Sequence, residues 1–407
     1  MVRLVYTGDR KLRLIMDSHR RVPKNFREVE YLESNGTQYI DTGYKAIPAT
    51  TKFELYFEPT NVSDNSFVFG ARPDTSICAS TMTSYKAVNK MRQDCAGVST
   101  YFTTTLSLNQ KYLFTAYNKT VSLNTESYTG TIERSTTRSN YNFALFTVNT
   151  AGTFDSRIFN GKIYYAKLWD NGVLVRDFIP CLDNNNVPCM WDRVEQKAYY
   201  NQGTGTFSYG HTITPVKYLE SSGTQYIDTG YKPNNASGLY IDAQKTAVGN
   251  VILIGCRNNS TTDSRWWINP SGISHNICWN DIYRIIDFDM DRHTYQMNYY
   301  NSKKRIIDNI VGDDITETLN PSSFSVSATL FCANNNTGVS NFASAKIYTA
   351  KITEGSTLVR DYIPVKDENN VGYMFDTVSH TLYANAGTGS FVVGDEYKDI
   401  TRFLKGA

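Results

Sequence analysis

Three aspartates alternate along the stretch DFDMD, at Asp287, Asp289 and Asp291. On a β-strand alternate side chains point to the same face, so the three carboxylates would share one side. Carboxylate pairs about 5–5.5 Å apart hydrolyse glycosidic bonds with retention of configuration, and carboxylate clusters also bind cations. The sequence favours a solvated strand edge, because aspartate reaches less far than the glutamates that such hydrolases generally use. A cation site and a hydrolase centre are the alternatives.

Aromatic residues indicate a second kind of chemistry, since pyranose rings stack on flat aromatic faces while polar side chains hydrogen-bond the hydroxyls. The stretch RWWINP contains adjacent tryptophans, Trp266 and Trp267, and only one of them can face the core from a strand. The sequence favours packing of all the tryptophans of this half in the interior; the alternative is that one of the adjacent pair is exposed in a binding face. The candidates are Trp266, Trp267, Trp279, Arg257 and Tyr283 in the second half of the chain, and Arg72, Tyr85 and Tyr101 in the first.

Signals for metal binding and for nucleophilic catalysis are weak. The five histidines are scattered, no cluster has zinc spacing, and neither a G-x-S-x-G elbow nor a phosphate-binding loop occurs. The DNNN turn at residues 183–186 can supply the hard oxygen ligands of calcium, so calcium is a cofactor that the sequence allows. The seven cysteines are expected to be mostly reduced and buried, and a Cys181–Cys189 bridge is the alternative.

Charge and hydropathy exclude some classes of partner. Forty-one basic and 39 acidic residues give a formal charge of +2, which makes nucleic acid a poor candidate. No stretch approaches the about 20 apolar residues that cross a bilayer, and the N-terminus lacks the apolar core and cleavage site of a signal peptide. We therefore expect no membrane insertion and no signal-dependent export.

The elements that must position these residues occur twice. YLESNGTQYIDTGYK at residues 31–45 returns as YLESSGTQYIDTGYK at 218–232, with one change in fifteen positions. KIYYAK at 162–167 returns as KIYTAK at 346–351, and LVRDFIP at 174–180 returns as LVRDYIP at 358–364. Solenoid repeats run to only about 20–50 residues, so each copy is a whole domain. About 180 residues is ample for a separate core.

The repeated units are typical of strands and turns, without a convincing helical stripe. KFELYFE places Phe53, Leu55 and Phe57 on one face, as expected of a half-buried strand, and its counterpart GLYIDA does likewise. The core face of the strand beginning at KIYYAK and of its copy is expected to carry Tyr164, Ala166, Leu168, Tyr348, Ala350 and Ile352.

The repeat sets the predicted domain boundaries. Residues 1–28 precede it and are rich in arginine and lysine, which indicates a basic arm: a solvated extension or a docking segment. Two domains follow at 29–210 and 216–396, joined by a linker at 211–215 and followed by a tail at 397–407.

The opening E-Y-L-E-S-x-G-T-Q-Y-I-D-T-G-Y and the closing R-D-(F/Y)-I-P, M-(W/F)-D and Y-x-N-x-G-T-G-(S/T)-F resemble those of concanavalin A-like, laminin G-like jelly-roll domains of gut bacterial and phage structural proteins. The resemblance covers residues 29–210 and 216–394. It implies two curved antiparallel sheets per domain, a fold often used to bind glycans and often mounted on phage structural proteins. The expected fold class is all-β: two tandem concanavalin A-like jelly-roll β-sandwiches with a basic N-terminal arm.

The function that we expect is that of a non-enzymatic phage virion-surface protein, in capsid or tail, whose lectin-like domains bind host cell-surface glycans. Its partners would be these glycans and, through residues 1–28, other virion proteins; a homo-oligomer is left open. The alternatives are a glycan hydrolase that uses the aspartate cluster, a purely structural decoration protein and a bacterial surface adhesin.

Overall fold

A computed structural model of the chain describes residues 3–6, 12–15 and 20–397, apart from 63–65, 73–78, 84–88, 96–97, 132, 250, 259–264, 270–275, 280–281, 286–288, 303, 309 and 315–323. Two compact units make up the chain: Arg21–Thr212 is one, and Ile213–Ala407 together with Met1–Arg20 is the other, so the two domains divide between Thr212 and Ile213. This division falls within the linker predicted at 211–215. A short hairpin, β1 (Arg3–Tyr6) and β2 (Leu12–Ile15), lies in the N-terminal segment.

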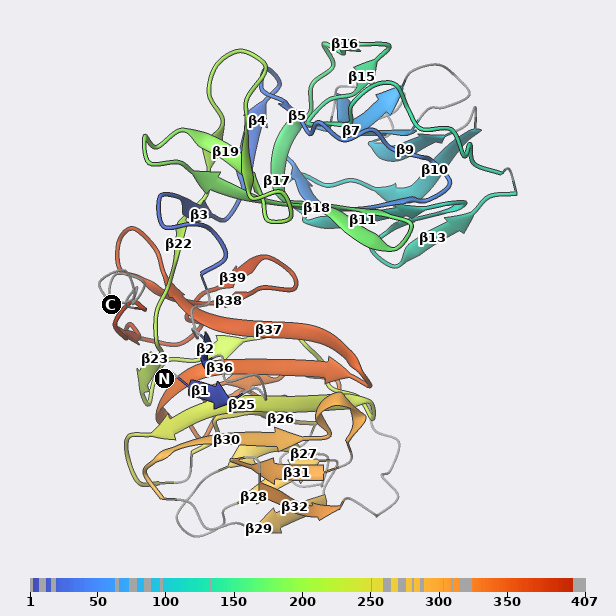
Figure 1. Ribbon diagram of the computed structural model, residues 1–407. Helices are drawn as coiled ribbons and strands as arrows, with labels where there is room; N and C mark the ends of the chain where they lie inside the picture. Colours follow the sequence, from blue (N-terminus) through green and yellow to red (C-terminus); the bar gives the residue numbers. More distant parts are fainter. Residues whose placement is uncertain are drawn as a thin grey trace. The chain divides into compact units, whose positions relative to one another are not determined.

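The first domain consists of two largely antiparallel sheets (Figure 1). The first sheet has the order β13 (Glu126–Thr129), β12 (Thr120–Leu123), β11 (Tyr112–Tyr117), β6 (Thr51–Pro59), β17 (Asn160–Asp170), β18 (Val173–Leu182), β19 (Pro188–Asp192) and β20 (Lys197–Tyr200), with β4 (Leu32–Asn35) on β17, β3 (Arg27–Val29) on β18 and β21 (Ser208–Tyr209) on β4. The second has the order β10 (Val98–Thr105), β9 (Lys90–Cys95), β8 (Ala79–Thr83), β7 (Ser66–Arg72), β14 (Ala144–Leu145) and β5 (Ile40–Asp41), with β15 (Asn149–Thr150) on β7 and β16 (Thr153–Phe154) on β15.

The second domain repeats this plan strand for strand. Its first sheet has the order β32 (Ile310–Asp314), β31 (Lys304–Ile307), β30 (Arg292–Met297), β25 (Ser237–Lys245), β36 (Ser344–Glu354), β37 (Thr357–Lys366), β38 (Gly372–Asp376) and β39 (Thr381–Tyr383), with β23 (Leu219–Ser222) on β36, β40 (Val392–Val393) on β23 and β22 (Thr212–Pro215) on β37. Its second sheet has the order β29 (Ile282–Ile285), β28 (Asn276–Trp279), β27 (Arg265–Asn269), β26 (Ile254–Arg257), β33 (Thr329–Leu330) and β24 (Ile227–Asp228), with β34 (Ala333–Asn334) on β26 and β35 (Val339–Ser340) on β34.

The core of each domain is made by the alternating apolar residues that the sequence predicts. Phe53, Leu55 and Phe57 of β6 are buried in the first domain's main core, as are Leu239 and Ile241 of β25 in the second. Their alternate neighbours point to the outer face of the first sheet, which is therefore polar and aromatic. The predicted all-β sandwich fold is confirmed. Among the described residues the only helical element is one 3-10 turn, η2 (Tyr299–Asn301), and no helix there is long and apolar enough to cross a membrane.

The repeated opening motif builds the same buried turn in both domains. Ser34 Oγ donates to Gln38 Oε1 at 3.0 Å, and the backbone N–H of Asn35 donates to the same oxygen at 3.0 Å. In the second domain Ser221 and Gln225 make the same contact, also at 3.0 Å. These side chains satisfy buried backbone groups, so the repeated motif is a framework element.

Residues 21–29 are packed into the first domain, although the sequence analysis placed most of them in the arm. Val22 and Phe26 are buried in a cluster with Trp191, whose ring centroid lies 4.6 Å from that of Phe26. Arg21 forms an ion pair with the buried Glu28, and β3 pairs with the end of β18. The arm that remains outside the described sandwich is thus shorter than predicted.

Candidate functional site

A β-bulge in β36 changes which side chains reach the outer face of the second domain's first sheet. Asp242 of β25 is paired with Thr349 and the next residue, Ala243, with Ile347, so the register skips Tyr348. A bulge gives one strand an extra residue and redirects its side chain. Tyr348 was expected on the core face together with Ala350. It instead lies on the outer face beside Thr349, because the bulge breaks the strict alternation on which that expectation relied.

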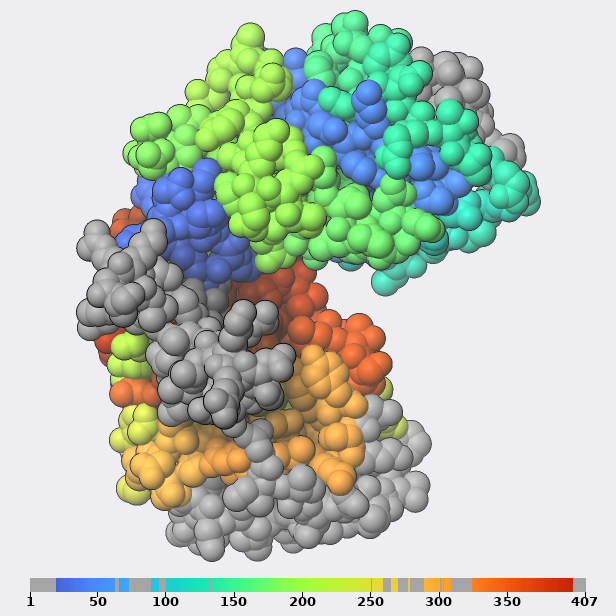
Figure 2. All heavy atoms as spheres, in the orientation of Figure 1, coloured from blue at the N-terminus to red at the C-terminus, as the bar shows by residue number. Residues whose placement is uncertain are grey.

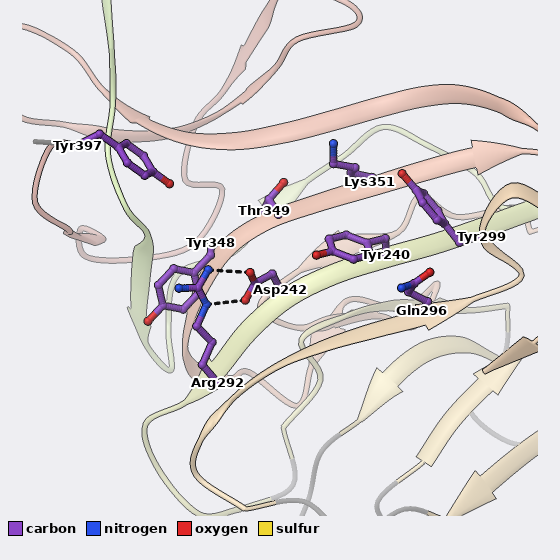
Figure 3. A pocket seen from close by; sticks show the side chains of 9 residues that line it. All are labelled: Tyr240, Asp242, Arg292, Gln296, Tyr299, Tyr348, Thr349, Lys351 and Tyr397. Carbon is purple, nitrogen blue, oxygen red and sulfur yellow. Dashed lines mark hydrogen bonds and ion pairs between the residues drawn. The ribbon is translucent and has the colours of Figure 1, made fainter. Parts of the chain in front are cut away.

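Three neighbouring strands place polar and aromatic side chains around this bulge (Figure 3). Tyr240 and Asp242 project from β25, Arg292 and Gln296 from β30, and Thr349 and Lys351 from β36, in keeping with the period of two. In the space-filling view the side chains of β30 and β31, in orange, lie at the surface (Figure 2). The three strands thus form a continuous outward-facing floor.

A cavity of about 300 Å³ lies on this floor. Its lining consists of Tyr240, Asp242, Arg292, Gln296, Tyr299, Tyr348, Thr349, Lys351 and Tyr397. Four of these nine residues are tyrosines and the rest are polar or charged. The volume is at the lower end of the range of about 300–1,000 Å³ in which small-molecule sites fall.

Arg292 and Asp242 form the strongest polar contact in the cavity. Arg292 donates from Nε to Asp242 Oδ1 and from Nη2 to Oδ2, both at 2.7 Å, in a bidentate pair. The guanidinium carbon also lies 3.6 Å from the centre of the Tyr348 ring. Burial opposes the charge on Arg292, but the Asp242 carboxylate outweighs it and holds the pKa of Arg292 above its ordinary value. The pair is therefore a fixed array of donors and acceptors beside an aromatic face.

The tyrosines of the cavity are held by contacts with one another. The Tyr240 and Tyr299 ring centroids lie 5.6 Å apart, and those of Tyr299 and the exposed Tyr300 lie 4.3 Å apart. Tyr300 has a φ of 53°, a left-handed conformation that is uncommon for a bulky residue, and Asn298 has a φ of 49°, which asparagine adopts readily. Burial raises the pKa of Tyr299 and of Tyr348, so both keep neutral hydroxyls at physiological pH.

The remaining polar groups are partly committed to the protein. Lys351 Nζ lies 3.2 Å from Asp361 Oδ1, and the Thr349 hydroxyl donates to the backbone oxygen of Tyr362 at 2.9 Å. Within the described part of the chain, the side-chain amide of Gln296 has no hydrogen-bond partner. It can therefore donate to and accept from a ligand.

Trp266 and Trp267, the two candidate tryptophans whose side chains the structure describes, do not form a binding face. Trp266 is fully buried in the main core, and Trp267, on the opposite side of β27, is 7% exposed and packs against Ile252, Cys278 and Ala333. Alternation does separate the two indoles, as expected. Both indoles are buried, as the sequence favoured, because a second apolar cluster covers the outer side of β27.

The other predicted binding residues are not brought together with the cavity. Arg257, at the end of β26, donates from Nε to Asn335 Oδ1 at 2.9 Å, and Arg72 ends β7 of the first domain. Tyr101 is 46% exposed on β10, with the Arg92 guanidinium 5.7 Å from its ring centre. The side chains of Trp279 and Tyr283, and all of Tyr85, lie outside the described residues. A role for any of these in ligand binding stays a prediction.

The aspartate cluster does not lie on a strand face where the structure describes it. Asp289 and Asp291 are exposed in a turn before β30, and the Asp291 backbone N–H donates to Asp289 Oδ1 at 2.7 Å. The alternation predicted at these two positions is therefore wrong, since the Asp289 side chain organises a turn. Its carboxylate also lies 2.7 Å from His293 Nε2. Asp287 lies outside the described residues.

The turn proposed for calcium uses its aspartate to hold the backbone. Asp183 Oδ1 accepts the backbone N–H groups of Asn185 at 2.8 Å and Val187 at 2.9 Å. Asp367 makes the equivalent bonds in the second domain, to Asn369 and Val371. Calcium binding at residues 183–186 stays a prediction. Nearby Cys181 and Cys189 face each other across β18 and β19 as free, buried thiols.

The cavity residues were missed because sequence alternation alone does not reveal which outer faces are hollow. One signal was present: KIYYAK and KIYTAK differ at a single position, where Tyr165 of the first copy becomes Thr349 of the second. Thr349 lines the cavity.

Comparisons with known proteins concern the fold. No family model matches the chain, and no curated protein matches it. Among solved structures, domains LG4-5 of the mouse laminin alpha1 chain match 94% of this chain and 98% of theirs, at 10% identity and a TM-score of 0.29. A candidate carbohydrate-binding protein of Bacteroides ovatus matches 46% of this chain and 61% of its own, at 13% identity and a TM-score of 0.33. The NanB sialidase of Streptococcus pneumoniae matches 89% of this chain and 74% of its own, at 10% identity and a TM-score of 0.27.

Matches this distant carry no argument about activity. The sheets of the chain itself form two tandem all-β sandwiches, the fold that the repeated motifs led us to expect.

Proposed function

We propose that the protein is a non-enzymatic glycan-binding protein, and that its second domain binds one pyranose residue in the cavity between β25, β30 and β36. The observation that carries the proposal is the cavity itself, where tyrosine rings lie beside a bidentate Asp242–Arg292 pair. A pyranose presents an apolar ring face to aromatic side chains and hydroxyls to fixed donors and acceptors.

The charges of the cavity favour an uncharged sugar. Arg292 is neutralised by Asp242 and Lys351 by Asp361, so an anionic ligand would have to compete with a carboxylate already in place. Binding of a neutral sugar depends little on ionic strength, because no charge pair is formed with the ligand. Raising NaCl from about 50 to about 500 mM should change the dissociation constant by less than about twofold.

A glycan array tests the proposal, with the full chain compared with its Tyr240→Ala and Tyr117→Ala variants. Tyr240 lies in the cavity floor, whereas Tyr117 is an exposed tyrosine at the end of β11 in the first domain. Removing an aromatic anchor costs about 2 kcal/mol or more, roughly thirtyfold in affinity. Tyr240→Ala should therefore lose binding and Tyr117→Ala keep it. Binding unchanged in Tyr240→Ala, or cleavage of a bound glycan, would contradict the proposal.

The place of the protein in a larger assembly is a second part of the proposal. The repeated motifs resemble those of phage structural proteins, so we propose display on a virion surface, through an arm that docks onto other virion proteins. Because residues 21–29 pack into the first domain, the arm to remove is 1–20. Its deletion should leave both domains folded and abolish incorporation into particles. Incorporation at the normal level would show that the arm is dispensable.

A further inference from the structure

The outer face of the first domain's first sheet is built from the same set of strands as the cavity face of the second domain. The two faces can therefore be compared residue by residue. Tyr56 of β6 is paired with Tyr165 of β17, and its neighbour Phe57 with Ile163, so the register skips Tyr164 as it skips Tyr348 in the second domain. Both domains therefore have the same bulge at the same place.

A cation lies over an aromatic pair in both domains. Lys111 Nζ is 4.3 Å from the Tyr164 ring centre, as the Arg292 guanidinium is 3.6 Å from Tyr348. Tyr164 meets Tyr31 edge to face at 5.5 Å, and Tyr348 meets Tyr218 in the same way at 5.6 Å. This part of the cavity wall is common framework and does not distinguish the two domains.

The two domains differ at the next residue of the strand and at the two residues of the neighbouring strand that lie beside it. In the first domain Tyr165 is only 3% exposed: its ring stacks on Tyr56 at 5.8 Å and its hydroxyl donates to Glu54 Oε1 at 3.1 Å. The ring thus spans from β17 to β6 across the face. The pairing of the strands shows which positions correspond. Tyr56 of the first domain corresponds to Asp242 of the second, Glu54 corresponds to Tyr240, and Tyr165 corresponds to Thr349. In the second domain the same positions line the open cavity.

We infer that this chain has one sugar site: Thr349 leaves the face of the second domain open, whereas the Tyr165 ring, held by Tyr56 and Glu54, closes the face of the first domain. The inference rests on the proposed function and goes beyond it, since it assigns one sugar site to a chain with two similar domains. Attachment to a glycan-coated surface would then need several copies of the chain for avidity.

Thr349→Tyr tests the inference, because it puts into the second domain the residue that the first domain already accommodates at the same register. The probes are four uncharged methyl glycosides, of glucose, galactose, mannose and N-acetylglucosamine, observed by saturation-transfer NMR on the full chain. Thr349→Tyr should weaken binding at least about tenfold. Thr349→Ser keeps the small side chain and the hydrogen bond to Tyr362, and should bind within about twofold of the unmodified protein.

Two controls keep the result interpretable. Tyr165→Phe removes only a hydroxyl in the first domain and should leave binding unchanged. Circular dichroism and thermal unfolding verify that each variant is folded. If Thr349→Tyr does not fold, Thr349→Gln replaces it as a smaller, flexible occluding side chain with the same expected loss.

The outcomes separate the two claims. Loss of binding in Thr349→Tyr with retention in Thr349→Ser supports the single site. Binding that survives in a folded Thr349→Tyr variant overturns the inference, while sugar binding as the function stands. Absence of binding by the unmodified protein to all four probes overturns the proposed function and the inference with it.

Discussion

At the scale of single residues, the candidate site depends on side chains whose partners are far apart in sequence. Asp242 and Arg292 are 50 residues apart, and their bidentate contact follows from the pairing of β25 with β30. Indoles are flat and apolar, which makes tryptophans candidates for stacking on a sugar, but Trp266 and Trp267 are both buried, as the sequence favoured. Burial of a large aromatic depends on what covers it, and local sequence does not carry that information.

His293 provides a pH-dependent test at the residue scale. Its Nδ1 lies 2.5 Å from Asp308 Oδ2 and its Nε2 lies 2.7 Å from Asp289 Oδ1. Burial lowers the pKa of His293, but the two carboxylates outweigh it and hold the pKa above 6.5. The pKa values of Asp289 and Asp308 are lowered in turn.

The free energy of unfolding changes with pH wherever a group has different pKa values in the folded and unfolded states. The stabilisation from protonated His293 is fully present below about pH 6.5 and is lost as the pH rises through its folded pKa. The stabilisation from the two carboxylates is present above about pH 3.9 and is lost as the pH falls through their folded pKa values. An NMR titration of the His293 ring should give a pKa above 6.5, and His293→Gln should remove the fall in unfolding temperature on the alkaline side. A measured pKa at or below 6.5 would contradict the contacts described.

At the scale of elements, the sequence predicted the strands well and their irregularities poorly. The alternation in KFELYFE correctly placed Phe53, Leu55 and Phe57 in the core. The same logic failed at Tyr348, since a bulge adds one residue to a strand without changing its composition. Comparison of the two copies adds information that periodicity lacks, because the exchange of Tyr165 for Thr349 lies in the cavity.

The duplicated turn offers a matched pair of variants. Gln38 and Gln225 are buried, and each accepts hydrogen bonds from a serine hydroxyl and a backbone N–H. Changing either to alanine leaves buried donors unsatisfied, which should cost about 1–3 kcal/mol of unfolding free energy in the domain that carries it. Denaturant titration measures this cost. Gln110→Ala, at an exposed position, should stay within about 0.5 kcal/mol. Equal effects of the buried and exposed changes would rule out the framework role.

At the scale of the whole molecule, the duplication predicted two domains, and the structure has two compact units. The predicted start of the first domain was too late by several residues. The segment before it has a structural counterpart in the second domain, where Ile213 packs with Phe375, but its sequence is not repeated, so the repeat did not indicate that Val22 and Phe26 cover Trp191.

Each domain should therefore fold alone as residues 21–212 and 213–397. Circular dichroism should give a β-sheet spectrum and one cooperative thermal transition for each fragment. A fragment of 29–212 loses Val22 and Phe26, at about 1.5–3 kcal/mol per buried side chain, and should unfold at a lower temperature than 21–212. Equal unfolding temperatures of these two fragments would mean that residues 21–28 do not belong to the domain.

The central claim is that the second domain's cavity holds a sugar, and a crystal structure of the full chain with the glycan selected on the array tests it most directly. We expect one pyranose per chain, with its ring against Tyr240 or Tyr348 and its hydroxyls bonded to Asp242 and Arg292. A sugar that binds in the first domain or on the outer side of β27, and not in the cavity, would contradict the proposed site.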